Sequence, residues 1–436
     1  MRYYNGVRHP VPFPCPANVR RIDMGAYPLV DSMHANGVLL DLDILKVVSI
    51  ECSELMLLKE KEIIEHVGKA HTVNPSSPKQ VAELLWVKLR VQGDREVPRT
   101  DSGGLSTDAS TLKLYKDIHP VVAAILDWRQ YQKIQGTYAD KLPRMVSDKG
   151  RIHTRFKPTD TTTGRYASED PNLQNIPSRS DLGKRIRSAF IPVPGWKLVG
   201  RDLSQIEMRI TAHLSQEPSM LAGYHTPGWD MHTQTAMDIF GLTIDQVDKH
   251  KHRLPAKTCG FGVVYLIGAQ GLQGAIAVAG GGFWPESECQ ALLDRFYEAR
   301  PYIRAAQEAQ FARARRYGMV WTECGRHRII PQVRSALKWV EGAGLREGAN
   351  QPTQGLAGDI LKISMAEQWD LLKHFNRGDE RVRVLLQVHD EVIYEAREDV
   401  AEEWSELVRP TMEDCIKLTV PILSEGAIAD NWEDLK

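Results

Sequence analysis

The sequence has few cysteines, and their spacing indicates neither a metal site nor a disulfide framework. The six cysteines include no CxxC pair: Cys15, Cys52, Cys259, Cys289, Cys324 and Cys415. A zinc framework and a disulfide framework are both disfavoured by this scatter. No run approaches the roughly 18 to 20 apolar residues of a transmembrane helix, and proline and charge interrupt the start where a signal peptide needs an apolar core. We therefore expect a soluble cytoplasmic protein with reduced thiols and no membrane partner.

An excess of charge of either sign is also missing. The formal net charge is -1, from 55 Lys and Arg against 56 Asp and Glu. A strongly basic domain would directly indicate nucleic acid, so here such a partner must be inferred from local groups. The 436 residues are enough for two or three packed units.

Hydrophobic periodicity predicts a mainly helical first half followed by strands and further helices. Residues 1–22 are rich in proline and arginine without periodicity, and we interpret them as an extended arm. Helical spacing predicts helices at about 41–69, 80–91, 109–115, 120–135, 204–214 and 345–375, with a helix-rich segment at 215–318. Strand patterns occur at 196–204 and, as hairpins, at 320–334 and 381–397. Polar loops are predicted at 95–110 and 151–187.

Two carboxylates follow predicted strands that are far apart in the chain. Asp202 lies at the end of WKLVGRDLS, and Asp390 lies at the bend of RVRVLLQVHDEVIYEAR. If the strands are neighbours, the pair offers oxygen ligands of the kind that Mg²⁺ prefers, completed by water and phosphate oxygens. Two such ions suit phosphoryl transfer. The alternative is that each aspartate is a solvated turn residue, and the two acids alone do not decide between these interpretations.

The segment RLPAKTCGFGVVY repeats functional side chains every four residues. Arg253, Lys257, Phe261 and Tyr265 therefore lie on one slowly drifting helical face. Cations on this face suit a triphosphate, and rings suit a base. The alternative is an ordinary amphipathic helix with a solvated basic end and a buried aromatic end.

The polar run from Arg155 to Phe190 could contact nucleic acid through several side chains. Its cations are Arg165, Arg179, Lys184, Arg185 and Arg187, and its amides are Asn172, Gln174 and Asn175. Such cations bind phosphates and such amides reach base edges or sugars. An ordered loop without this role remains the alternative, as does a solvated surface for the cluster Arg313, Arg315, Arg316, Arg326, Arg328 and Arg334.

Taken in order, these motifs resemble those of a family A DNA polymerase of the bacterial DNA polymerase I type. GRDLSQIEMR is similar to the first catalytic motif, RLPAKTCGFGVVY to the nucleotide-binding helix, and LLQVHDE to the second catalytic motif. TGRYASEDPNLQNIP resembles a motif that contacts the template and primer, and DMHTQTAMDIFG and NQPTQGLAGDILK are smaller matches in the right order. The resemblance extends from about Asp23 to the carboxyl end.

The resemblance implies a two-metal catalytic centre. Asp202 and Asp390 would bind two Mg²⁺ ions, for which Mn²⁺ can substitute, with help from the main chain of Leu203. Glu391 would be a supporting acid, and Lys257 would complete the catalytic group. The primer 3'-hydroxyl would then attack the alpha-phosphorus of a deoxynucleoside triphosphate, with pyrophosphate as the leaving group.

The resemblance also implies a nucleotide site. Its members would be Arg253, Lys257, Phe261, Tyr265, His232, Gln205 and Glu207. Arg253 and Lys257 would hold the triphosphate, with help from His232 and Gln205, and Phe261 would stack near the sugar and base. Tyr265 would lie where the template base enters, and Glu207 would exclude ribonucleotides. Closure of this helix over a correct pair would assemble the site by induced fit.

Contacts to DNA are implied for a further group of side chains. Its members are Arg165, Asn172, Gln174, Asn175, Asn350, Gln354, Gln387 and His389. Arg165 would contact the minor-groove side of the primer end. His389 has an alternative as a turn residue that only orders its hairpin.

The implied fold is α+β, a right hand with an antiparallel palm sheet and helical fingers and thumb. The expected divisions are an arm at 1–22, palm entry and thumb at 23–140, thumb base and palm at 141–214, fingers at 215–345 and palm at 346–436. About 22 residues precede the resemblance, so we expect no proofreading exonuclease within this chain. The implied partners are primer-template DNA, deoxynucleoside triphosphates and a separate exonuclease or replication proteins, for a monomer in a bacterial or phage-infected cell.

Four positions depart from the family pattern. Leu203 stands where tyrosine is usual, which puts the stringency of sugar selection in question, and Leu266 stands where glycine is usual. Gly260 replaces a larger polar residue and costs about 1 kcal/mol of helix propensity relative to alanine. Pro255 removes a backbone donor inside the predicted helix, so the helix either begins near Leu254 or is kinked there.

Three other functions remain to be separated from DNA synthesis. A related RNA polymerase is disfavoured by Glu207 and Phe261. A two-metal nuclease has no need for the face formed by Arg253 and Lys257, and a silent DNA-binding protein has no need for both metal acids.

Overall fold

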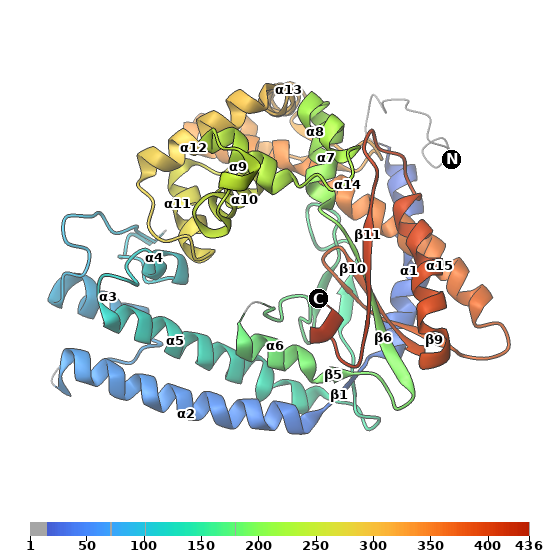
Figure 1. The fold of residues 1–436 in the computed structure, drawn as a ribbon, viewed down its shortest axis with the longest axis horizontal. Coiled ribbons are helices and arrows are strands. Elements are labelled where there is room, and N and C mark those ends of the chain that lie inside the picture. The colour runs from blue at the N-terminus through green and yellow to red at the C-terminus, as the bar shows by residue number, and fades with distance from the viewer. Residues whose placement is uncertain (1–14, 70–71, 101, 179, 436) are drawn as a thin grey trace.

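The computed structural model describes residues 15–69, 72–100, 102–178 and 180–435 (Figure 1). Helix α1 (Pro16–Asn36) begins inside the segment expected to be an extended arm. That expectation is wrong for residues 16–22, because Pro16 occupies the first helical turn, where its missing N–H costs nothing. Residues 1–14 lie outside the described residues. Within the described part, no helix is long and apolar enough to cross a membrane.

A four-stranded antiparallel sheet forms the centre of the fold. Its strands, in spatial order, are β11 (Ser424–Ala429), β6 (Trp196–Leu203), β10 (Glu391–Arg397) and β9 (Val382–Val388). The predicted hairpin at 381–397 is confirmed as β9 and β10, which turn at His389–Asp390. Strand β10 also pairs with β6 in a register that sets Glu391 opposite Asp202.

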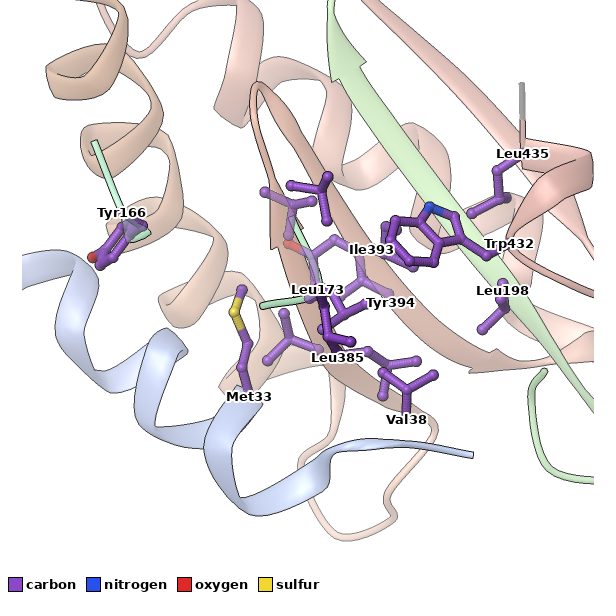
Figure 2. Close-up of a cluster of buried hydrophobic side chains, with 14 of the residues drawn as sticks. Met33, Val38, Tyr166, Leu173, Leu198, Leu385, Ile393, Tyr394, Trp432 and Leu435 are labelled. Atoms are coloured by element: carbon purple, nitrogen blue, oxygen red, sulfur yellow. The ribbon is translucent and has the colours of Figure 1, made fainter. Parts of the chain in front are cut away.

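The main hydrophobic core lies against this sheet. Tyr394, Leu385 and Ile393 from the two hairpin strands are buried together with Met33 of α1 and Trp432 near the carboxyl end (Figure 2). The Tyr394 hydroxyl donates a 2.5 Å hydrogen bond to the Gln368 Oε1 atom, so this buried polar group is satisfied. The apolar residues on either side of the 389–390 turn thus anchor the turn in the core.

Long helices pack around the sheet. Helix α14 (Lys338–Phe375) packs against α1 and α15 (Ala401–Glu413), and α1 packs against β9. Helix α14 begins seven residues before the predicted start at about 345, so the hydrophobic pattern marked only its buried part.

A helical arm extends away from the sheet at the lower left of Figure 1. Its elements are α2 (Leu42–Val67), α3 (Pro78–Ala82), the π-helical turn η2 (Glu83–Lys88), α4 (Ala109–Lys113), α5 (Pro120–Ile134), the π-helical turn η3 (Gln135–Ala139) and the 3₁₀ turn η4 (Leu142–Met145). Helix α2 packs along α5, and the distal helices have a separate core. The helices predicted at 41–69, 80–91, 109–115 and 120–135 are confirmed. Asp41 and Ser77 cap two of them through side-chain oxygens.

A second group of helices lies at the top of Figure 1 and has its own core. It comprises α7 (Ile206–Ser215), α8 (Pro218–Tyr224), α9 (Met231–Phe240), the 3₁₀ turn η5 (Ile244–Gln246), the π-helical turn η6 (Lys249–Arg253), α10 (Leu254–Val264), α11 (Ala269–Val278), α12 (Glu286–Ala299) and α13 (Pro301–Tyr317). This confirms the prediction of a helix-rich segment at 215–318.

Short strands connect these regions. They are β1 (Val38–Leu40), β2 (Arg151–Ile152) and β5 (Phe190–Ile191) in one sheet, the pair β3 (Arg155–Lys157) and β4 (Ala167–Glu169), and the predicted hairpin of β7 (Met319–Trp321) and β8 (His327–Ile329). The expectation of an irregular loop at 151–187 is therefore wrong in part, and α6 (Asp181–Ser188) also lies mostly within it. The remaining 3₁₀ turns are η7 (Pro331–Arg334), η8 (Glu398–Val400) and η9 (Glu433–Leu435).

Candidate active site

The two predicted metal acids meet at one end of the central sheet. Asp202 is the penultimate residue of β6 and lies directly opposite Glu391 at the start of β10. The Leu203 N–H donates a 3.1 Å hydrogen bond to the main-chain carbonyl of Asp390. The Asp202 residue is exposed at this edge. Pairing of β6 with β10 therefore places two aspartates that are 188 positions apart in the chain on neighbouring strand ends.

The environment of Asp390 favours a cationic neighbour. Burial raises the pKa of its carboxyl to about 6, the Arg165 guanidinium opposes this shift, and the nearby Glu207 adds to it. The Arg165 Nη2 atom lies 3.5 Å from the Asp390 Oδ1 atom. Bringing a further cation beside Asp390 would favour its ionised form.

The donor set at this edge fits a hard divalent cation. Two side-chain carboxylates and the main-chain carbonyl of Leu203 offer oxygen atoms of the kind that such an ion prefers, and exposure of Asp202 leaves room for water or phosphate oxygens. No group of three or more His, Cys, Asp or Glu side chains suited to a metal ion occurs among the described residues. A site that relies on two carboxylates and on ligands from outside the chain would not form such a group.

Glu391 is a buried acid at the same end of the sheet, paired with Asp202. Its residue is only 3% exposed, and its Oε1 atom would lie 2.8 Å from a β-carbon placed on Gly200. The absence of a side chain at Gly200 therefore leaves the space that the Glu391 carboxylate occupies.

Glu207 joins three regions of the molecule. Its Oε1 atom accepts a 2.5 Å hydrogen bond from Arg165, and its Oε2 atom accepts a 2.6 Å bond from the Tyr265 hydroxyl. Gln354 of α14 also hydrogen-bonds to Tyr265, and burial beside Glu207 raises the pKa of Tyr265 to about 12. The predicted sugar-excluding residue is thus buried in contact with the predicted primer and template residues.

A buried ionic network holds the loop that carries Arg165. The Arg326 guanidinium donates 2.7 Å bonds to both Asp23 and Asp359, and Lys362 donates to Asp23 at 2.8 Å and to the Pro158 carbonyl at 3.0 Å. A β-carbon at Gly164 would lie 2.5 Å from the Arg326 side chain, and Gly164 has a φ of 82°. Glycine is therefore required immediately before Arg165.

A small pocket collects several predicted DNA-contact residues. Arg165, Gln174, Gln387, His389 and Asp390 line a cavity of about 30 Å³. The Gln174 Nε2 atom donates to the Gln387 Oε1 atom at 2.9 Å. His389 has a φ of 57° at the tip of the hairpin, so it serves the turn and also faces the pocket.

The predicted nucleotide helix is α10. Arg253, Lys257, Phe261 and Tyr265 are all partly or fully exposed, while the intervening side chains are largely buried. This arrangement confirms that the four residues share one face. Pro255 lies in the first turn of α10, and the π-helical turn η6 immediately precedes it. The helix therefore begins at Leu254, and the wider preceding turn accommodates the proline ring.

Two further residues hold the basic end of α10. The Arg253 guanidinium contacts Asp230 Oδ2 at 2.9 Å and Thr233 Oγ1 at 3.2 Å. Asp230 also caps α9 through bonds to the His232 and Thr233 N–H groups. Sequence reasoning missed Asp230 and Thr233, although the D-x-x-T spacing ahead of a helix is a recognisable N-cap pattern.

His232, a predicted triphosphate contact, lies beside this face. Its ring centroid is 5.3 Å from that of Phe261, and the Lys257 Nζ atom is 5.9 Å from the Phe261 centroid. Burial, and next the charge of Lys257, lowers the pKa of His232 to about 4. A neutral imidazole is therefore held next to two cations.

Leu266 follows α10 with a φ of 55°. This is the left-handed conformation that glycine adopts easily and that costs other residues about 1 to 2 kcal/mol. The chain keeps the glycine-type backbone at this departure from the family pattern. Leu203 is 2% exposed in the main core, so the side chain that replaces tyrosine packs away from solvent.

Other predicted DNA-contact residues lie outside the small pocket. Asn172 accepts a 3.1 Å bond from Ser168, and the Asn175 carbonyl accepts a 2.6 Å bond from Tyr138. Asn350 lines a different cavity, together with Tyr265. Gln205, which is predicted to contact the nucleotide and not DNA, has a φ of 51° at the turn between β6 and α7.

Several cations that could have formed open basic surfaces have structural partners instead. Arg187 is 3% exposed and lies 4.4 Å from the Trp432 ring centroid, and Arg185 pairs with Glu51. Arg326 is buried in the ionic network, and Arg328 pairs with Glu347 at 2.5 Å. Arg179 lies outside the described residues. Arg185, Arg187, Arg326 and Arg328 therefore each have a partner within the fold.

The chain is similar to known proteins over almost its whole length. Residues 42–434 match the model of DNA polymerase family A. The thermostable DNA polymerase I of Thermus aquaticus is 37% identical over 418 residues, which cover 96% of this chain and 48% of that relative. DNA polymerase I of Pseudomonas aeruginosa is 35% identical, over 95% of this chain and 44% of that relative. The chain spans about half the length of the curated relatives it matches.

A solved structure has the same overall arrangement. The POL domain of Pol1 from M. smegmatis, in complex with DNA primer-template and dNTP, superposes with a TM-score of 0.85 at 30% identity. The match covers 96% of this chain and 72% of that chain. The fold is accordingly the α+β right hand, with small antiparallel sheets among many helices, as the motifs predicted.

Proposed function

The chain belongs to DNA polymerase family A, and we propose that it is a template-directed DNA polymerase that adds deoxynucleotides to a primer 3'-hydroxyl. The observation that carries this proposal is the meeting of Asp202 and Asp390 across β6 and the β9–β10 turn. The proposed ligands are primer-template DNA and deoxynucleoside triphosphates, the same two classes of ligand that the M. smegmatis POL domain holds in its complex.

Asp202, Asp390 and the main-chain carbonyl of Leu203 are proposed to hold two Mg²⁺ ions. Such ions activate an attacking oxygen and stabilise a leaving oxygen in phosphoryl transfer. The Arg165 guanidinium, 3.5 Å from Asp390, keeps this carboxylate ionised and oriented. Glu391 contributes negative charge from the adjacent position of β10.

The exposed face of α10 is proposed to bind the incoming nucleotide. Lys257 and Arg253 would neutralise its phosphates, and Asp230 orients Arg253 for this contact. Neutral His232 can donate or accept a hydrogen bond there without adding a third positive charge. Phe261 supplies the ring against which the sugar and base pack.

Glu207 is proposed to select the sugar. It is 7% exposed and fixed by two hydrogen bonds, so it cannot move aside at low cost for an additional hydroxyl. Arg165, Gln174, Gln387 and His389 would contact the primer end, while Asn350 and Gln354 would contact the template near Tyr265. Asn172 and Asn175 are proposed as further DNA contacts on the adjoining loop.

Primer extension tests the proposal. Wild type should extend a primed DNA template with deoxynucleotides and Mg²⁺, whereas Asp202→Asn and Asp390→Asn should each lose at least about 1,000-fold in rate, about 4 kcal/mol of barrier. Asp430→Ala is the matched control, because this carboxylate is 75% exposed and pairs only at the surface. Absence of extension by wild type would refute the function, and full activity of Asp390→Asn would refute the site.

A further inference from the structure

Trp339 is the most exposed large apolar side chain among the described residues, with 74% of its surface accessible. It lies in the first turn of α14, beside Lys338, whose side chain is 91% exposed. Exposed tryptophan has a large apolar ring and leaves it in water at a cost of about 2 kcal/mol or more. A single exposed apolar side chain is common on protein surfaces, so a binding role for Trp339 has to be argued from its surroundings.

Helical spacing places Trp339 on the same face as predicted template contacts. Positions 339, 343, 346, 350 and 354 fall within an arc of about 80° on a helix of 3.6 residues per turn. Gln354 hydrogen-bonds to Tyr265. Asn350, Arg346 and Ala343 line a cavity of about 650 Å³ together with Tyr265. The cavity therefore extends from Tyr265 along α14 to Ala343, and Trp339 lies about one helical turn beyond Ala343 on the same face.

The charges along this face suit a phosphate backbone. Arg346 is exposed, and the nearby acids are already neutralised by cations of the chain. Glu341 lies 3.0 Å from Lys338 and 3.1 Å from Arg315, and Glu347 lies 2.5 Å from Arg328. Cations with an aromatic ring are the combination that binds unpaired nucleic acid without sequence preference, because every base has a face that stacks.

We propose that Trp339 and Arg346 form a platform for the unpaired template strand ahead of the active site. This inference rests on the proposed function, since it requires a template that passes Tyr265. Trp339 and Asn350 are about 16 Å apart along the helix axis. At about 3.4 Å per stacked nucleotide, the ring receives a base roughly three to five nucleotides beyond the templating position.

Binding to DNA with different overhangs tests the platform without requiring catalysis. Fluorescence anisotropy would compare one primer-template with a single unpaired template nucleotide and one with about ten. Trp339→Ala should weaken binding to the long overhang at least about fivefold and leave binding to the short overhang unchanged, since stacking contributes about 1 to 3 kcal/mol per base. Trp339→Phe, which keeps a ring, should restore most of the affinity.

The matched control is Tyr302→Ala, which removes an aromatic side chain of 52% exposure from α13. It should bind both DNAs as wild type does. Arg346→Ala should reduce the magnitude of the salt-dependence slope for the long overhang by about one, as expected for one phosphate contact. Thermal unfolding of each variant checks that the chain remains folded.

Three outcomes would overturn the platform. In the first, Trp339→Ala binds each of the two DNAs with the same affinity as wild type; in the second, it loses the same factor of affinity for the long and the short overhang. In the third, Trp339→Ala changes the oligomeric state and leaves DNA binding unchanged, which would assign Trp339 to a protein contact. Failure of the proposed function is seen separately, as a wild-type protein that binds primer-template but does not extend it.

Discussion

At the scale of single residues, the position of the Glu207 carboxylate is fixed by hydrogen bonds to two different parts of the chain. It accepts hydrogen bonds from Arg165 and from Tyr265, which come from a loop and from the end of α10. A carboxylate held by two donors and buried to this degree presents one fixed surface to a ligand. Leucine occupies position 203, where the family pattern has a tyrosine beside the sugar-selecting residue, and the Leu203 side chain is buried in the core.

Glu207→Ala should therefore increase ribonucleotide incorporation. Removing the carboxylate opens space and should raise the ratio of ribonucleotide to deoxynucleotide kcat/KM at least about tenfold, about 1.4 kcal/mol of lost discrimination. Glu207→Gln keeps the volume and one acceptor, so its effect should be smaller. Single-nucleotide extension measures both ratios, and an unchanged ratio in the alanine variant would place the selection elsewhere.

His232 should make stability sensitive to acid. Its pKa in the folded protein is about 4, below the ordinary 6.5, because of burial and next the charge of Lys257. The unfolded chain therefore binds this proton more readily. The contribution of neutral His232 is complete above pH 6.5 and is lost as pH falls toward 4. The loss is at most about 3.5 kcal/mol, at about 1.4 kcal/mol per pKa unit.

Urea unfolding between about pH 4 and pH 8 measures this dependence. His232→Gln cannot take up the proton, so its free energy of unfolding should fall less steeply below pH 6.5 than that of wild type. The exposed residue His250 provides the control variant, His250→Gln, whose pH dependence should match wild type. Identical curves for His232→Gln and wild type would contradict the expected coupling.

At the scale of elements, helix α10 and the loop carrying Arg165 are each positioned by contacts outside themselves. Pro255 is tolerated because α10 begins one residue earlier and follows a π-helical turn. The Arg165 loop is held by Arg326 and Lys362, which reach it from the β7–β8 hairpin and from α14. The site is thus assembled by elements that are distant in the chain.

Asp359→Asn should show how much the buried ionic network stabilises the fold. Asp359 is fully buried and accepts bonds from Arg326 at 2.7 Å and Thr322 at 2.8 Å. Weakening a buried pair on one side typically costs about 3 to 5 kcal/mol. Urea unfolding should show that the free energy of unfolding falls by about 3 kcal/mol, the lower end of this range, because asparagine retains a polar group.

Asp399→Asn is the matched control for this network. Asp399 is 60% exposed and pairs with Arg397 at the surface, so the Asp399→Asn substitution should leave the free energy of unfolding almost unchanged. Primer affinity should also fall in Asp359→Asn, because the loop presenting Arg165 loses its support. Equal stability of the two variants would show that the network does not hold the loop.

At the scale of the whole molecule, the net charge of -1 does not describe how the arginines are distributed between structural ion pairs and proposed ligand-binding surfaces. Many arginines are bound in ion pairs of the fold, such as Arg326 with Asp359 and Arg328 with Glu347. Those proposed to meet nucleotide and DNA include Arg253, on the exposed face of α10, and Arg165, which lines the small pocket beside Asp390. Local potential, and not net charge, governs attraction of a polyanion over a Debye length of about 8 to 10 Å.

Primer-template binding should consequently depend strongly on salt. Four or more phosphate contacts would lower affinity by at least about 100-fold between about 50 and 200 mM monovalent salt. Anisotropy titrations over this range measure the slope of log Kd against log salt concentration. A slope near zero would mean that the proposed surfaces do not meet the phosphate backbone.

Hydrophobic periodicity in the sequence determined the principal helices, and the resemblance of its motifs to the family implied the fold class and the candidate site residues. The helical period placed Arg253, Lys257, Phe261 and Tyr265 on one face, and alternating apolar residues placed Asp390 at a hairpin turn, because these features depend on local geometry. The helix within residues 16–22, the short strands at 151–187 and the early start of α14 were not predicted, since they depend on tertiary contacts.

Only the tertiary structure decided which polar groups share an environment. Register between β6 and β10 brought Asp202 beside Asp390. Packing of α7 against the end of α10 gave Glu207 its bond to Tyr265, and burial removed Arg187 and Arg326 from the candidate nucleic-acid surface. A side chain's pKa, partners and exposure arise from neighbours distant in sequence, and local periodicity carries no information about those neighbours.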